Sequence, residues 1–160
     1  MLKISTKGRY GLRALVELAH RSGKGPVLLD DLAQAQSIPK KYLYAVFGAL
    51  KNAGIVVSTR GAGGGYYLAK PPEDITALEV IEVLEGPLDI VECTQHPDIC
   101  AMAARCPTTE LWVGLSAHIK KFLAAKSLAG MVQEYEENLL RLGLTGDSDR
   151  DRKRLEAKGT

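Results

Sequence analysis

The fold is decided by residues 27–69, which read VLLDDLAQAQSIPKKYLYAVFGALKNAGIVVSTRGAGGGYYLA. Asp30 is a good N-cap for a short helix over DLAQAQ, and Ser37 with Pro39 predicts the start of a second helix that ends near Asn52–Gly54. Two short helices joined by a tight turn are the helix-turn-helix pattern.

The second of these helices has an apolar face and a basic face. Its apolar residues recur at i, i+3, i+4 and i+7, the spacing of a face that turns toward a core. They are Leu43, Val46, Phe47 and Leu50. The other face carries Lys40, Lys41, Tyr44 and Lys51. We therefore expect a helix that is buried on one side and presents cations and aromatic rings on the other.

A β-hairpin follows. Ile55 to Thr59 is rich in β-branched residues, RGAGGG is a turn, and Tyr66 to Ala69 is the return strand. Because a strand rather than a helix follows the glycines, this turn is not a dinucleotide-binding loop. Gly63 and Gly64 allow a tight backbone and a close approach to phosphates or to a minor groove. The fold class is mainly α, a winged helix-turn-helix with a small β-hairpin wing.

Charge is divided unevenly along the chain. Residues 1–70 hold eleven Lys and Arg against three Asp and Glu, a net charge of +8, whereas residues 71–160 hold ten against sixteen, a net −6. A basic half joined to an acidic half is expected when one part meets a polyanion and the other does not. The first part is therefore expected to bind double-stranded DNA.

Position within the fold indicates the residues that would contact this DNA. The N-terminal turn of a recognition helix meets base edges and phosphates in the major groove. Here that turn holds Pro39, Lys40, Lys41 and Tyr42. Arg60 stands at the base of the wing tip, where it could enter a narrow minor groove.

Helices flank this segment on both sides. Ser5 is expected to cap a first helix to about Arg21, and Thr76 with Glu79 forms a capping box for a short linker helix. Further helices are expected from Pro107 to about Ala125 and near Leu128 to Leu142. The first of these two has an apolar stripe, which predicts the seam of a homodimer, at Leu111, Leu115, Ile119, Phe122 and Leu123.

We divide the chain into three parts. Residues 1–72 form the winged helix-turn-helix domain, and residues 73–145 contain the linker helix, a cysteine loop at 88–106 and the dimerisation helices. Residues 146–160 are a charged tail expected to be disordered.

Three cysteines, Cys93, Cys100 and Cys106, fall within fourteen residues with the spacing C-x6-C-x5-C. Thiolates at such intervals on an irregular loop can converge on one soft metal centre. Zinc prefers closer paired cysteines and would need a fourth ligand, for which His96 is the local candidate. An iron-sulfur cluster, a structural zinc ion and a thiol switch all remain open from the spacing alone.

Four features together resemble the Rrf family of bacterial winged-helix regulators. They are KGRY at 7–10, IPKKYL at 38–43, STRGAGGGY at 58–66, and three cysteines ahead of a long helix. The resemblance covers about residues 1–140. It implies a homodimer that binds palindromic promoter DNA, with Tyr42 and Arg60 at DNA-contacting positions. It also implies an iron-sulfur cluster, 2Fe-2S or 4Fe-4S, ligated by Cys93, Cys100 and Cys106.

The resemblance does not supply a fourth ligand. Family members use a histidine where this chain has Thr109, or an aspartate of the partner's first helix where this chain has Arg9. His96, a carboxylate such as Asp98, water or a small thiol are the candidates. Serines of the family's assembly regulator are replaced here by Pro39 and Lys41, so the recognised DNA sequence is expected to differ.

The function predicted from these features is a DNA-binding repressor whose cluster senses iron, redox state or nitric oxide. The alternatives are a winged-helix regulator with zinc or a thiol switch, and a small iron-sulfur electron-transfer or carrier protein. No nucleophile and base pattern or catalytic carboxylate pair indicates an enzyme. Because no stretch approaches the roughly 20 apolar residues of a membrane span, and no signal-peptide core opens the chain, a cytoplasmic protein is expected.

Overall fold

The computed structural model describes residues 4–61 and 64–146. Gly63 and the predicted charged tail, apart from Gly146, lie outside the described residues. The helices and strands follow in this order: α1 Thr6–His20, α2 Leu29–Gln36, α3 Lys40–Asn52, β1 Val56–Thr59, β2 Gly65–Leu68, α4 Ala77–Glu85, α5 Thr109–Ala124 and α6 Leu128–Leu142. Among the described residues, no helix is long and apolar enough to cross a membrane.

Side-chain caps fix the start of three helices. The hydroxyl of Ser5 accepts a hydrogen bond from the Lys7 amide at 3.0 Å, and that of Thr76 accepts from the Glu79 amide at 3.2 Å. Ser127 does the same for α6, accepting from the Gly130 amide at 3.1 Å. Each cap satisfies an amide that the first helical turn leaves without a partner. The predicted caps at Ser5 and Thr76 are confirmed.

The turn between α2 and α3 differs from the sequence expectation. Leu28 is the N-cap of α2, and Asp30 lies one residue inside the helix. The Asp30 carboxylate is paired instead with Lys40 at the start of α3. Ser37 does not open α3 but ends α2, in the left-handed conformation with φ 50°. Pro39, with φ −58°, is the residue from which α3 starts.

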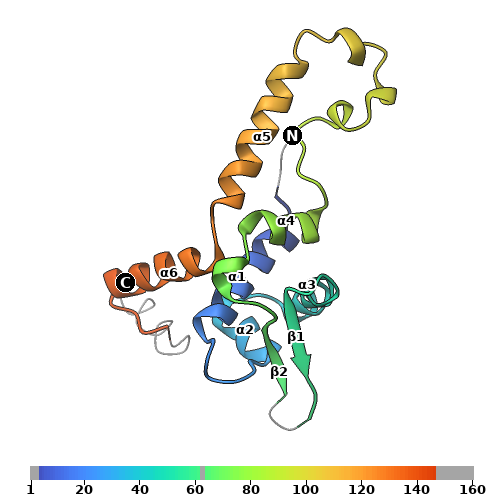
Figure 1. Cartoon of the computed structure of the whole chain (residues 1–160). Helices are drawn as coiled ribbons and strands as arrows, with labels where there is room; N and C mark the ends of the chain where they lie inside the picture. Colours follow the sequence, from blue (N-terminus) through green and yellow to red (C-terminus); the bar gives the residue numbers. More distant parts are fainter. Residues whose placement is uncertain (1–3, 62–63, 147–160) are drawn as a thin grey trace, which may run out of the picture.

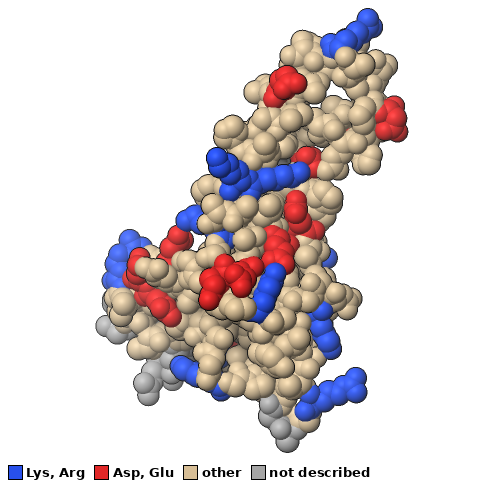
Figure 2. All heavy atoms as spheres, in the orientation of Figure 1, with Lys and Arg blue, Asp and Glu red and all other residues tan. Residues whose placement is uncertain are grey.

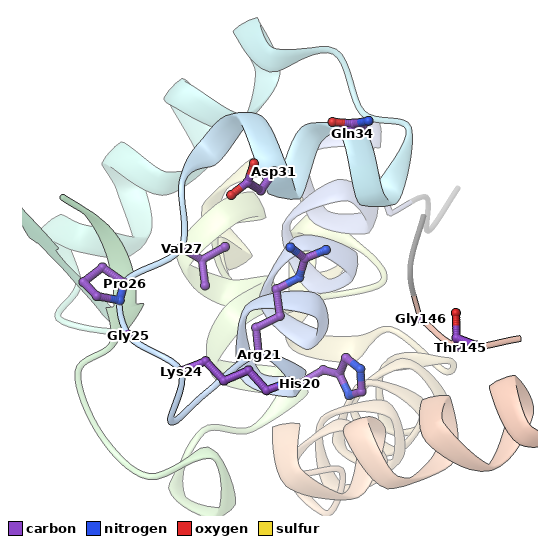
Figure 3. A pocket seen from close by; sticks show the side chains of 10 residues that line it. All are labelled: His20, Arg21, Lys24, Gly25, Pro26, Val27, Asp31, Gln34, Thr145 and Gly146. Carbon is purple, nitrogen blue, oxygen red and sulfur yellow. The ribbon is translucent and has the colours of Figure 1, made fainter. Parts of the chain in front are cut away.

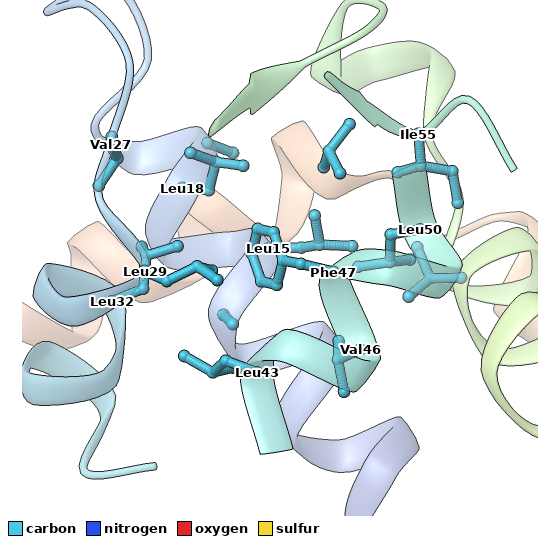
Figure 4. Close-up of a cluster of buried hydrophobic side chains, with 14 of the residues drawn as sticks. Leu15, Leu18, Val27, Leu29, Leu32, Leu43, Val46, Phe47, Leu50 and Ile55 are labelled. Atoms are coloured by element: carbon cyan, nitrogen blue, oxygen red, sulfur yellow. The ribbon is translucent and has the colours of Figure 1, made fainter. Parts of the chain in front are cut away.

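The core lies where α1, α2 and α3 meet. Figure 4 shows this cluster, in which Leu15, Leu43, Phe47 and Leu50 are all 0% exposed. Burying a Leu or Phe side chain fully stabilises a fold by roughly 1.5–3 kcal/mol. The predicted apolar face of α3 is confirmed. Leu128, at the start of α6, is also completely buried in this cluster, so α6 belongs to the winged domain.

One charged group is buried beside this core. Glu17 of α1 is 1% exposed, and its carboxylate accepts hydrogen bonds from Arg21 at 2.5 Å and from Gln36 at 2.8 Å. The Tyr135 hydroxyl of α6 donates to the same carboxylate at 3.3 Å. Glu17 thus joins α1, the end of α2 and α6, and its partners offset the cost of removing a carboxylate from water.

The wing is a two-stranded antiparallel hairpin. The register runs from Val56 opposite Leu68 to Thr59 opposite Gly65. Val27 adds a bridge to the return strand, since its amide donates to the Tyr66 carbonyl and its carbonyl accepts from the Tyr66 amide, both at 2.8 Å. The return strand of the wing is therefore fastened at Tyr66 to the segment that precedes α2.

Residues 88–124, the cysteine loop and α5, form an arm that projects from the winged domain (Figure 1). The loop lies at the far end of the arm, and the wing lies at the opposite end of the molecule. Two contacts fasten the base of the loop to α5. The Ile90 amide donates to Ser116 Oγ at 3.3 Å, and Asp89 pairs with Lys120 at 3.3 Å.

Candidate functional site

The exposed face of α3 carries the residues that the sequence places on DNA. Pro39, Lys40 and Lys41 are exposed, and the side chains of Tyr42 and Tyr44 are 43% and 56% exposed. The Lys41 ammonium lies over the Tyr42 ring at 5.5 Å from its centroid, and Lys40 lies over Tyr44 at 5.6 Å. The face therefore offers alternating cations and aromatic rings, as a surface that contacts phosphates and bases requires.

Helix α1 supports this face in a way that the sequence reading missed. The Tyr10 ring packs edge-on against Tyr42, with 5.9 Å between the centroids. The guanidinium of Arg13 lies over Tyr10 and also donates to the backbone carbonyl of Gln36, at the end of α2. The sequence feature that could have indicated this support is the spacing of Tyr10 and Arg13, which stand three residues apart and so share one side of α1.

Lys40 is held by two neighbours. Its ammonium pairs with the carboxylate of Asp30, and this contact, with a further one to Tyr44, raises the pKa of Lys40 above its ordinary value. The two residues are 46% and 60% exposed in their side chains, so the pair faces solvent. Lys40 is charged at any physiological pH, and its charge is already shared with a protein carboxylate.

Arg60 follows directly after β1 and is exposed. Gly61 has φ +98°, a conformation that favours glycine, and a side chain at Gly64 would approach the Thr59 carbonyl to 2.6 Å. The backbone packing of the wing therefore requires a glycine at position 64, in addition to any approach to DNA. Lys51 Nζ donates to Ser58 Oγ at 2.6 Å and ties α3 to the wing, which the sequence reading also missed.

A hollow lies between α3 and the wing. Asp30, Lys40 and Tyr44 line one side, and Thr59, Gly64 and Tyr66 line the other. On the face shown in Figure 2, Lys and Arg lie around the lower end near the wing, Asp and Glu gather at the level of α4 and α6, and charges of both signs lie along the arm. The uneven charge of the sequence is thus also uneven in space.

Each cysteine lies at a short 3-10 turn of the loop. Cys93 lies within the turn Glu92–Thr94, Cys100 follows the turn Pro97–Ile99, and Cys106 follows the turn Ala103–Arg105. All three are free thiols and half-buried. Within residues 4–61 and 64–146, no group of three or more His, Cys, Asp or Glu side chains lies close enough to hold a metal ion. The three sulfurs share one loop but are not gathered at one point.

Cys106 differs from the other two thiols by its hydrogen bonds. Its sulfur lies 3.3 Å from the Thr108 hydroxyl, and hydrogen bonds from Thr108 and Thr109 lower the pKa of this thiol. Trp112 also donates to the Thr108 hydroxyl, at 3.2 Å, which fixes that side chain at the start of α5. A thiol with a lowered pKa is the more reactive nucleophile and the better metal ligand near neutral pH.

A family model described as "Rrf2: Iron-dependent Transcriptional regulator" matches residues 4–134 of this chain. The chain belongs to the Rrf2 family. The HTH-type transcriptional regulator CymR of Bacillus subtilis is 42% identical over 127 residues, which are 79% of this chain and 87% of CymR. The HTH-type transcriptional regulator IscR of Photorhabdus laumondii is 37% identical over 153 residues, 96% of this chain and 90% of that IscR.

Solved structures of Rrf2 proteins have the same fold. The IscR of T. potens superposes with a TM-score of 0.70 at 37% identity, covering 86% of this chain and 90% of that one. CymR, described as the global cysteine regulator of B. subtilis, superposes with a TM-score of 0.68 at 40% identity, covering 84% and 98%. The predicted family, winged-helix fold and DNA-binding regulatory function are confirmed. These relatives are regulators rather than enzymes.

The two residues that are candidates for a fourth ligand, and the two positions at which family members supply one, are all exposed or half-buried. His96 and Asp98 are exposed on the cysteine loop, and Thr109 is half-buried at the start of α5. Arg9 is exposed on α1 and donates to Thr6 at 3.3 Å. Within one copy of this Rrf2 protein, the structure does not distinguish a fourth ligand.

A separate hollow lies at the ends of α1 and α2 (Figure 3). Its lining includes His20, Arg21, Lys24 and Asp31, together with Thr145 and Gly146 from the segment after α6. It contains none of the cysteines and none of the residues predicted to contact DNA. Both signs of charge line it, so it selects no class of ligand by charge.

Proposed function

We propose that this Rrf2 regulator is a homodimeric repressor whose promoter binding is controlled by an iron-sulfur cluster on Cys93, Cys100 and Cys106. The observation that carries the proposal is the set of three free, half-buried thiols on one loop. The family description as iron-dependent supports it. Because its target is promoter DNA, we also propose that the protein works in the cytoplasm.

The donor set fits an iron-sulfur cluster by its chemistry. Thiolates are the usual ligands of such clusters, and each of the three cysteines lies within or directly after a short 3-10 turn of the loop. Hydrogen bonds from Thr108 and Thr109 favour the thiolate form of Cys106, which is the form that ligates iron. When bound, a 2Fe-2S or 4Fe-4S cluster supplies a centre that responds to iron supply, redox state or nitric oxide.

A continuous set of contacts leads from the cysteine loop to the recognition helix. At the end of α4, just before the loop, the Glu85 carboxylate accepts from the Gly8 amide at 2.8 Å and from Ser5 Oγ at 2.6 Å. Gly8 and Ser5 begin α1, and α1 holds α3 through Tyr10 and the shared core. A loop that changes shape with its ligand can therefore move α1 and the recognition helix with it.

The arm supports the dimer part of the proposal. Leu111, Leu115 and Phe122 of α5 are 59%, 42% and 64% exposed, an apolar stripe that one copy leaves uncovered. Packing two such stripes together would bury them and would set the separation of two recognition helices. A dimer of helix-turn-helix domains reads half-sites about one helical turn apart.

The experiment has two measurements on one anaerobic preparation. The wild type is expected to be brown, with iron and sulfide in stoichiometric amounts, and its affinity for DNA upstream of its own gene should differ from that of the cluster-free protein. Changing any one of the three cysteines to alanine should remove the colour. Arg60→Ala is the control, expected to weaken DNA binding while the colour stays.

Two other outcomes would overturn the cluster but keep the regulator. Colourless protein with stoichiometric zinc would assign the loop to a structural metal ion. Metal-free protein whose DNA binding changes with a thiol oxidant would indicate a thiol switch instead. A structure of the Staphylococcus aureus CymR oxidized form, 33% identical to this chain, is the reason to test an oxidant. Absence of salt-dependent DNA binding in every state would favour an electron carrier instead.

A further inference from the structure

Asp30 is the acidic residue that stands at the recognition surface. It lines the hollow between α3 and the wing, on the same side as Lys40 and Tyr44. Its carboxylate is paired with the Lys40 ammonium, which also lies over the Tyr44 ring at 5.6 Å from the centroid. Lys40 is the first residue of α3, in the N-terminal turn of the helix, and a Lys at such a position can contact a phosphate.

This pairing sets two partners in competition for one ammonium. A Lys that neutralises a phosphate releases condensed counterions and strengthens binding regardless of base sequence. Lys40 makes this contact only if it leaves Asp30, and the carboxylate is then left beside the phosphates. An exposed ion pair holds its partners by only about 0–1 kcal/mol, so the exchange is possible but is not free of cost.

We propose that Asp30 restrains binding to DNA of any sequence by competing with phosphates for Lys40. The inference rests on the proposed docking of α3 in the major groove. Because the restrained contact carries no sequence information, the restraint lowers the affinity for random DNA and leaves discrimination to the groups that contact bases. Asp30 is thus a residue that improves specificity without touching a base.

The adjacent acid provides a matched control. Asp31 also lies in the first turn of α2, is exposed, and carries the same charge. It lines the other hollow, with His20 and Lys24, rather than the one beside α3. Asp30→Asn and Asp31→Asn therefore make the same change of net charge and the same change to the first turn of α2, but only the first releases Lys40.

The experiment measures binding of the full-length protein to a random-sequence duplex of about 30 base pairs over a range of salt concentrations. Asp30→Asn is expected to bind about threefold to fivefold more tightly than the wild type, the fold-change that corresponds to a surface ion pair. Its plot of log affinity against log salt should be steeper by about one phosphate contact. Asp31→Asn should stay within about twofold of the wild type.

Combining these changes with Lys40→Gln tests whether the gain passes through Lys40. In the Lys40→Gln background, Asp30→Asn should change the affinity by less than about twofold, because no ammonium is left to release. An equal gain in both backgrounds, or an equal gain from Asp31→Asn, would show general charge repulsion and overturn the proposal. So would unchanged or weaker binding by Asp30→Asn.

Two measurements distinguish a failure of this inference from misfolding of a variant and from a failure of the proposed DNA binding. Thermal unfolding of each variant checks the fold, and Asp30→Ser, which also suits the start of a helix, repeats the cycle if Asp30→Asn does not fold. A wild type that binds no duplex at low salt would contradict the proposed docking on DNA. A wild type that binds, with Asp30→Asn behaving identically, contradicts only the role of Asp30.

Discussion

The winged domain and the arm use their apolar side chains in opposite ways. In the winged domain Leu15, Phe47 and Leu50 are 0% exposed, and helices from both ends of the chain surround them. On the arm Leu111, Val113 and Phe122 are 59%, 46% and 64% exposed. The winged domain buries its own core within one copy, whereas the arm presents a surface that one copy cannot cover.

The same contrast separates the two candidate sites. The residues of α3 that are predicted to contact DNA stand on a helix whose opposite face is buried in the core. The cysteines stand on a loop without regular secondary structure beyond short 3-10 turns, which contacts α5 at its base through Ile90 and Asp89 and at its far end through Cys106 and Thr108. This division, a helix packed on a core and a loop on a projecting arm, is compatible with the proposed control of DNA binding by a ligand of the loop.

The largest expected effect is a loss of stability of the winged domain. Phe47→Ala should lower the free energy of unfolding by about 3–5 kcal/mol, because Phe47 is completely buried and packs edge-on against Tyr66 with centroids 5.0 Å apart. Urea denaturation measures this loss, and DNA binding should fall with it. Tyr67→Ala, on an exposed wing position, is the comparison and should cost less than about 1 kcal/mol. Equal losses would contradict the closed core described for this domain.

The next effect falls on the arm and should leave the winged domain intact. Leu115→Asp places a charge in the middle of the apolar stripe and is expected to weaken the dimer at least about tenfold, since a charge buried without a partner is costly. Sedimentation equilibrium measures the dissociation constant. Leu140→Asp, at a 78% exposed position of α6, is the matched control and should dissociate like the wild type. A dimer unaffected by Leu115→Asp would place the interface elsewhere.

The sequence predicted the features that depend on neighbouring residues. The caps at Ser5 and Thr76 and the apolar face of α3 follow from local hydrogen bonds and helical spacing, and all are confirmed. The predicted start of α2 was wrong: Leu28 is the N-cap, and Asp30 lies within the first turn, where its carboxylate pairs with Lys40 ten residues later. Helix ends are the least reliable part of a prediction from local sequence.

The candidate site was predicted residue by residue but not as an arrangement. The outward positions of Lys40, Lys41 and Tyr44 followed from the helical period. The packing of Tyr10 against Tyr42 could not be predicted in this way, because it depends on how α1 crosses α3. The cysteine loop has no period at all, so the spacing of the cysteines indicates their chemistry and says nothing of the distances between them. The role of each cysteine therefore stays a prediction.

A smaller effect is expected where α6 returns from the arm to the winged domain. Tyr135→Phe removes the hydroxyl that donates to the buried carboxylate of Glu17 at 3.3 Å and should cost about 1 kcal/mol. Urea denaturation with an unchanged slope would measure it. Tyr44→Phe, which removes an exposed hydroxyl of α3, is the control for stability and should leave the midpoint in place. An unchanged midpoint for Tyr135→Phe would mean that this hydrogen bond does not help to hold α6 on the winged domain.

The smallest effect concerns one thiol of the arm and no change in stability. Hydrogen bonds from Thr108 and Thr109 lower the pKa of Cys106, so a larger fraction of this thiol is thiolate at neutral pH. Thr108→Val removes the first of these donors, raises the pKa toward its ordinary value, and should slow alkylation of Cys106 by iodoacetamide about twofold to fivefold. Mass spectrometry of metal-free protein at about pH 7 measures the rate of alkylation at each cysteine.

Thr94→Val is the matched control, because the Thr94 hydroxyl donates to the Val91 carbonyl at 2.7 Å beside Cys93. If Cys106 is alkylated at the same rate in Thr108→Val and in Thr94→Val, the hydroxyl of Thr108 does not set the reactivity of this thiol.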